Sequence, residues 1–127
     1  MKKQNYKKYE FIFNEGTYGD SAYMIDFGKV GIISLTNQND KRKLIATLKK
    51  DDIFGEMGLI DNKVRTATAI ALEETQVSVI SKKTFDYLLK HDPLALRPLI
   101  KVLSHRLRNT TNLLQEYSRM PLLNANH

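Results

Sequence analysis

The segment from residue 54 to residue 69 combines the residue types that could hold a phosphate beside a sugar hydroxyl. Glu56 can accept hydrogen bonds from a ribose, and Arg65 offers a planar, permanently charged fork that matches a phosphodiester. Gly55 and Gly58 lack side chains, which would let backbone N–H groups approach an anion closely. Glu56 and Arg65 are nine positions apart, so one helical turn and a loop could bring both to a single pocket.

The elements around this segment are predicted to be short strands. All six glycines lie before residue 59, which favours a mainly β region with tight turns, followed by helices. Alternation of apolar and polar residues predicts strands at 9–13, 22–25, 30–35, 44–48, 67–72 and 75–80. We expect the aromatic residues of the first strand to share one face, and Gly31 to mark a β-bulge. A short helix at 56–60 would point its positive dipole end at the same site.

Helical signals replace the strand pattern after residue 80. Ser81 is the predicted N-cap of a helix through Lys90, with Phe85, Leu88 and Leu89 as its apolar stripe. The pair Asp92-Pro93 is a second start signal. Pro98 interrupts helical hydrogen bonding, so we expect one turn and then a longer helix to about Tyr117.

The longer helix has an apolar side whose role the residues leave open. It consists of Leu99, Val102, Leu103, Leu107, Leu113 and Leu114. This side could pack against the strands, or it could pair with a second copy of the chain to form a homodimer.

The 54–69 segment resembles the phosphate-binding cassette of the cyclic nucleotide-binding domain family. The family includes catabolite-activator-type regulators, kinase regulatory subunits and cyclic-nucleotide-gated channels. Gly16, the pair Gly19-Asp20 and Gly28 stand where the family has turn glycines, and the resemblance extends from about Tyr9 to Leu114.

The resemblance implies a mainly β fold with C-terminal helices. We therefore expect one domain over residues 1–127: an eight-stranded jelly-roll-like β-roll at about 9–81, followed at about 82–118 by a short helix and a longer lid helix. Ligand binding is expected to move the C-terminal helices, and the output partner stays open.

The resemblance also implies the ligand, cAMP or cGMP, and the residues that bind it. Arg65 is assigned to the phosphate and Glu56 to the ribose 2′-hydroxyl, within a ligand-binding set of Phe54, Gly55, Glu56, Met57, Gly58, Leu59, Arg65, Thr66 and Ala67. Candidates to cover the base are Leu103, Arg106 and Leu107. The hydroxyl of Thr66 could reach a guanine amino group and also tolerates adenine; we favour cAMP, with cGMP as the alternative.

One position departs from the family pattern. The family usually has glycine where this chain has Asp51, just before the run Asp52-Ile53-Phe54-Gly55. Because Asp adopts left-handed backbone angles more readily than most residues, we expect the turn to be kept.

Composition narrows the other classes of function. The net charge of +6 is interpreted as a solvated basic surface rather than a nucleic-acid-binding face, since no nucleic-acid-binding motif contains the basic residues. The chain has no cysteine, no apolar run near the ~18 residues that span a bilayer and no secretory leader, so we expect a cytoplasmic protein.

An enzyme is not expected. The three histidines, His91, His105 and His127, lie outside the predicted strands, which argues against a metal site inside the roll, and we expect no cofactor. No nucleophile elbow or phosphate-binding lysine loop occurs. The alternative is a fragment of a helix-turn-helix transcription regulator of the same family, whose DNA-binding module is missing because the chain ends about ten residues after the long helix.

Overall fold

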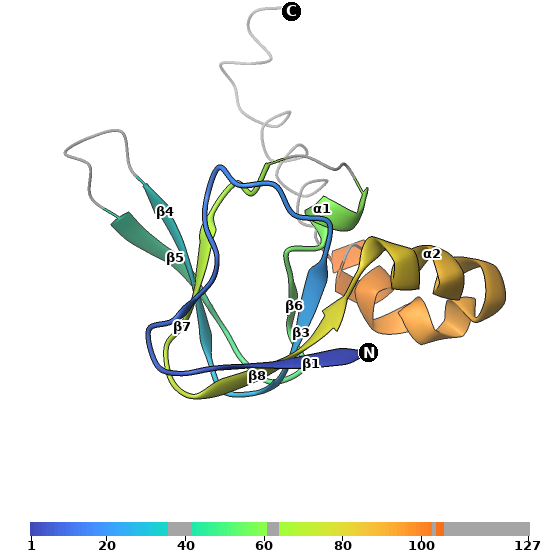
Figure 1. Ribbon diagram of the computed structural model, residues 1–127, viewed down its shortest axis with the longest axis horizontal. Helices are drawn as coiled ribbons and strands as arrows, with labels where there is room; N and C mark the ends of the chain where they lie inside the picture. Colours follow the sequence, from blue (N-terminus) through green and yellow to red (C-terminus); the bar gives the residue numbers. More distant parts are fainter. Residues whose placement is uncertain (36–41, 61–63, 103, 106–127) are drawn as a thin grey trace, which may run out of the picture.

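Two antiparallel sheets form the body of the molecule (Figure 1). The computed structural model describes residues 1–35, 42–60, 64–102 and 104–105. One sheet has the strand order β1-β8-β3-β6 and the other β2-β7-β4-β5. The strands of the described residues are β1 (Lys2–Tyr6), β2 (Phe11–Phe13), β3 (Ala22–Phe27), β4 (Val30–Leu35), β5 (Arg42–Leu48), β6 (Ile53–Phe54), β7 (Thr68–Ala71) and β8 (Thr75–Ile80). The predicted mainly β fold with eight strands and C-terminal helices is confirmed.

The helices follow the predicted start signals closely. They are α1 (Met57–Ile60), α2 (Lys82–His91) and the 3-10 helix η1 (Pro93–Leu96), after which residues 97–102 are α-helical. The Ser81 Oγ accepts a hydrogen bond of 3.1 Å from the backbone N–H of Thr84, which confirms Ser81 as the N-cap of α2. Pro98 lies in the first turn of the last helical segment, where its missing N–H costs nothing. The predicted end of that helix lies outside the described residues.

The amino-terminal strand was missed, and the predicted one is shorter. β1 pairs with β8 from Lys2↔Val79 to Tyr6↔Thr75, although its polar sequence shows no alternation. The prediction that Tyr9 belongs to the following strand is wrong, because Tyr9 has a φ of 71° and its N–H donates to the Ala71 carbonyl (2.6 Å). This left-handed residue forms the corner from which β2 begins.

In the pairing of β4 with β5, the β-bulge lies on β5 and not at Gly31. The pairing of β4 with β5 passes from Ile32↔Ala46 to Ile33↔Leu44, so Ile45 is the extra residue. A Cβ on Gly31 would lie 3.1 Å from Cδ atoms of Leu44 and Leu72, so this glycine makes room for two leucine side chains. In α2, Leu89 is exposed and does not belong to the predicted apolar stripe.

The turn before β6 keeps its shape without glycine. Asp51 has a φ of 72°, and its N–H donates to the Ile25 carbonyl at 2.8 Å. In return the Ile25 N–H donates to the Asp52 carbonyl at 3.0 Å. The expectation that Asp51 adopts the left-handed conformation is therefore confirmed.

Alternate residues of β3 divide the core into two clusters. Ile25 points into the roll and packs with Val30, Phe54, Ala69 and Val77. Ala22 points to the other side and packs with Ile53, Leu59, Ile80 and Leu99. The second cluster therefore joins the sheet, α1 and the C-terminal helical segment. Figure 1 shows α2 beside this sheet, on the opposite side of the roll from β4 and β5.

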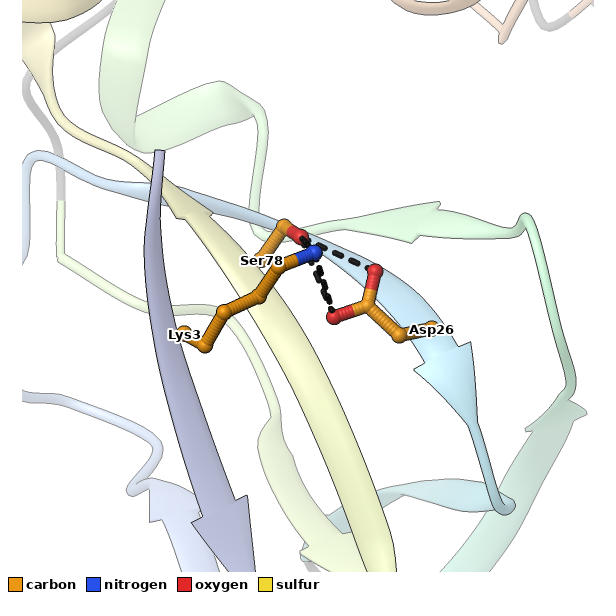
Figure 2. A network of polar contacts seen from close by, with 3 residues as sticks. All are labelled: Lys3, Asp26 and Ser78. Atoms are coloured by element: carbon orange, nitrogen blue, oxygen red, sulfur yellow. Dashed lines mark hydrogen bonds and ion pairs between the residues drawn. The ribbon is translucent and has the colours of Figure 1, made fainter.

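A polar network attaches the edge strand β1 to the sheet (Figure 2). The Lys3 Nζ donates to the Ser78 Oγ (2.6 Å) and pairs with Asp26 Oδ2 (3.0 Å). The fully buried Ser78 Oγ donates to Asp26 Oδ1 at 2.9 Å. Three strands, β1, β8 and β3, are joined in this way.

Candidate functional site

A pocket of about 460 Å³ lies between α1, the 64–67 segment and the strands β4 and β5. This volume is typical of a small-molecule site. The pocket is lined by Phe13, Ile32, Ile45, Ala46, Leu48, Phe54, Gly55, Glu56, Met57, Gly58, Val64, Arg65, Thr66 and Ala67. The lining includes every residue of the predicted ligand-binding set except Leu59, which is buried in the cluster that contains Leu99.

Arg65 is buried in the wall of this pocket, with 6% of its surface exposed. Its Nη1 donates to the Gly55 carbonyl at 2.7 Å and its Nη2 to the Ser21 carbonyl at 2.8 Å. Its backbone is held by the turn at residues 16–17: the Arg65 N–H donates to the Thr17 carbonyl and the Gly16 N–H donates to the Arg65 carbonyl, both at 2.7 Å. Side chain and backbone are thus fixed independently.

Three glycines surround the guanidinium. A Cβ on Gly19 would lie 2.6 Å from Nη2, and one on Gly55 or Gly58 would lie 2.9 Å from Nη1. A Cβ on Gly58 would also collide with the Gly19 carbonyl oxygen. From the sequence, Gly55 and Gly58 were predicted to let amides approach an anion closely; in the structure, their missing side chains also make room for the cation.

The buried guanidinium is only partly satisfied by neutral groups. The hydrogen bonds of its two Nη atoms go to the neutral backbone carbonyls of Gly55 and Ser21. Its Nε is buried and has no hydrogen-bond partner among the described residues. Because a buried charge is costly without an opposite charge, this arrangement favours an anion in the pocket.

Glu56 directly precedes α1 and lines the same pocket. It is 1% exposed, and its carbonyl accepts from the Leu59 N–H at 3.0 Å. Neither Glu56 nor Arg65 is therefore a surface residue. The Gly58 N–H donates to the Gly55 carbonyl at 3.2 Å, so an anion would share that donor.

The apolar wall of the pocket was not predicted from the sequence. Ile32, Ala46 and Leu48 are half-buried on β4 and β5, while Ile45 and Val64 are exposed at the rim. The alternation of strands 30–35 and 44–48 was visible, but the bulge at Ile45 changes which residues face the pocket. The three candidates to cover the base, Leu103, Arg106 and Leu107, lie outside the described residues.

The described residues contain no group of three His, Asp or Glu side chains that could hold a metal ion. No helix in the same ranges is both long and apolar enough to cross a membrane.

The two sheets form a jelly-roll-like β-roll, and its pocket combines a buried arginine with an apolar wall. The sequence model described as the cyclic nucleotide-binding domain matches residues 3–92. The chain belongs to this family.

Similar proteins include both receptors and kinases. The cyclic AMP receptor protein of Thermus thermophilus is 32% identical over 97 residues, which are 76% of this chain and 44% of the receptor. The human cGMP-dependent protein kinase 2 is 38% identical over 88 residues, which are 68% of this chain and 11% of the kinase. The crystal structure of the Thermus thermophilus catabolite activator protein matches with a TM-score of 0.79 at 29% identity, covering 92% of this chain and 55% of that one. The chain thus spans less than half the length of these receptor and kinase relatives.

Proposed function

We propose that this chain is a regulatory domain that binds a cyclic nucleotide, with cAMP favoured over cGMP, and has no catalytic activity of its own. The observation that carries the proposal is the buried guanidinium of Arg65, which lines a pocket and donates to two neutral backbone carbonyls. The cyclic phosphate carries one negative charge, and it would supply an opposite charge to this cation.

Each part of the ligand has a chemical counterpart in the pocket. Two N–H groups of Arg65 are used by carbonyls, which leaves three of its five donors for the phosphate. The exposed Thr66 hydroxyl and the Gly58 amide would add donors. Glu56 would accept the ribose 2′-hydroxyl.

The apolar wall suits a purine base. Ile32, Ala46 and Leu48 offer surface without hydrogen-bonding side chains, and Thr66 offers one hydroxyl. The names of the relatives include both cyclic AMP and cGMP. An adenine leaves fewer polar groups unsatisfied against such a wall than a guanine does, which favours cAMP.

The second core cluster offers a route from ligand to output. Leu59, three residues after Glu56, packs in one cluster with Leu99 of the C-terminal helical segment. We propose one domain over residues 1–127, in which the roll binds the nucleotide and the helices from about 82 to 118 respond. The ligand shifts this equilibrium only by its different affinity for the two arrangements.

Calorimetric titration with cAMP, cGMP and 2′-deoxy-cAMP tests the binding proposal. The parent chain should bind cAMP, and loss of the 2′-hydroxyl should weaken binding because Glu56 loses its partner. Replacing Arg65→Leu should cost about 3–5 kcal/mol of binding free energy. Arg42→Leu is the matched control, because Arg42 is exposed and does not line the pocket. Absence of heat with all three nucleotides would refute the proposal.

Hydrogen exchange tests the proposed coupling. Amides of residues 97–102 should gain protection on binding of cAMP, whereas unchanged exchange at saturation would contradict a switch. The alternative is that the chain is a fragment of a helix-turn-helix transcription regulator of the same family; a similar protein of Mycobacterium tuberculosis is named as a cAMP-activated transcriptional regulator. DNA binding by the full gene product, measured with and without cAMP, decides that point. Sedimentation of the same samples tests whether the apolar side of the last helix pairs with a second copy of the chain.

A further inference from the structure

Three aromatic rings form a floor beneath the guanidinium. The Phe13 centroid lies 5.8 Å from that of Tyr23 and 5.9 Å from that of Phe54. Tyr23 and Phe54 are stacked at 5.2 Å. Phe13 comes from β2 in one sheet, and the other two rings come from β3 and β6 in the second. The position of the Phe13 ring is therefore set by contact between the two sheets.

The cation lies directly on this floor. The Arg65 Cζ is 4.4 Å from the Phe13 centroid and 5.9 Å from the Tyr23 centroid. The negative face of an aromatic ring attracts a cation, and the attraction is stronger where water is excluded, as around this buried side chain. The carbonyls of Gly55 and Ser21 hold the two Nη atoms, and the ring fixes the guanidinium against the floor.

We propose that Phe13 is a positioning residue for ligand recognition: its ring holds the Arg65 guanidinium where the ligand's phosphate meets it. This inference rests on the proposed binding of a cyclic nucleotide. It differs from ordinary core packing because it acts through the charge of Arg65. A ring that merely fills space would change stability and would have the same effect on affinity whether or not residue 65 is charged.

A double-mutant cycle separates the two roles. Phe13→Leu should lower the affinity for cAMP about tenfold in the parent chain, the effect of a desolvated contact of this kind. In an Arg65→Gln background the same replacement should change the affinity less than twofold. Phe13→Tyr keeps the aromatic face and should retain the parent affinity. Val77→Ala is the control for loss of core packing, because Val77 is fully buried in the same cluster and does not line the pocket.

A measurement without ligand covers the case in which Phe13→Leu fails to fold. In the parent chain and in Phe13→Tyr, the NMR signal of the Arg65 Nε–H should show a ring-current shift, and Phe13→Met should remove it. Equal losses of cAMP affinity in the parent chain and in the Arg65→Gln background, or an unchanged Nε–H signal, would overturn the inference and leave nucleotide binding intact. Failure of the parent chain to bind any cyclic nucleotide would overturn both.

Discussion

At the scale of single residues, the site is organised around one buried cation. Burying Arg65 without partners would cost much free energy. Two backbone carbonyls and an aromatic ring contact its guanidinium, and three glycines leave room for it. Gly58 is the most constrained of these glycines, because a side chain there would meet both Arg65 and the carbonyl of Gly19. The nature of residue 58 should therefore control affinity through the position of the guanidinium.

Gly58→Ala should weaken cAMP binding by at least about tenfold, because the added methyl group displaces the guanidinium or the turn at Gly19. Titration calorimetry measures the change. Gly31→Ala is the matched control, since its added methyl meets only the ends of leucine side chains away from the pocket lining. An affinity of Gly58→Ala equal to that of the parent would contradict this description of the glycines.

Tyr9→Gly should raise the free energy of unfolding by up to about 1 kcal/mol. Tyr9 has a φ of 71°, and this left-handed conformation destabilises a residue with a Cβ by about 1–2 kcal/mol. Glycine avoids this strain, but its greater freedom in the unfolded chain offsets about 0.5–1 kcal/mol of the gain. Denaturant unfolding measures the difference. The other exposed tyrosine of this region, Tyr18, forms a bridge to Val64, so Tyr18→Gly should be destabilising. A less stable Tyr9→Gly variant would show that the corner needs the side chain.

At the scale of elements, the alternation of apolar and polar residues predicted the strands whose apolar residues are buried. Strands β4 and β8 were placed at their observed bounds, because burial requires their alternation. β1 was invisible because an edge strand with a polar sequence is defined by its partner β8 and by the Lys3 network. In the site, Glu56 and Arg65 were predicted from their chemistry and the glycine spacing. Phe13 and Ser21 come from distant strands and loops, and only the folded arrangement brings them to Arg65.

Tyr6 on the edge strand β1 also makes the stability of the fold depend on pH. Burial raises the pKa of the Tyr6 hydroxyl above its ordinary value of 10.0, and the charges of Tyr23 and Glu10 raise it further. The Tyr6 hydroxyl donates to Gln4 Oε1 at 2.6 Å. Above pH 10 the unfolded chain releases this proton before the folded chain does, so stability falls as pH rises.

The Tyr6 hydroxyl should lower the free energy of unfolding by at most about 1.4 kcal/mol per pH unit. The total decline with pH should therefore be shallower in Tyr6→Phe than in the parent chain. Urea unfolding of both proteins between pH 8 and pH 11 measures it. Parallel curves for the two proteins would show that Tyr6 does not carry the effect.

At the scale of the whole molecule, the two core clusters have different structural roles. The cluster inside the roll supports the pocket, and the cluster outside it joins α1 to the C-terminal helical segment through Leu59 and Leu99. We propose that a change at the ligand reaches the helices through this packed apolar contact. The helical segment should depend on that contact for its stability.

Leu99→Ala should lower the free energy of unfolding by about 2–5 kcal/mol, because Leu99 is 2% exposed in this cluster. Its neighbour Ile100 is 54% exposed, so Ile100→Ala should stay within about 0.5 kcal/mol of the parent. Denaturant unfolding of the three proteins compares them. Similar losses in both variants would mean that the helical segment does not pack on the sheet through Leu99.

The most direct test of nucleotide recognition removes the charge from the ligand instead of the protein. A methyl ester of the cAMP phosphate keeps the base, the ribose and the ring but is neutral. Calorimetry should show that the parent chain prefers cAMP to this ester by at least about 100-fold, as expected when a buried cation loses its anion. Arg65→Gln should abolish the preference, while Arg42→Gln should keep it. Equal affinity of the parent chain for cAMP and its neutral ester would contradict the central role given to Arg65.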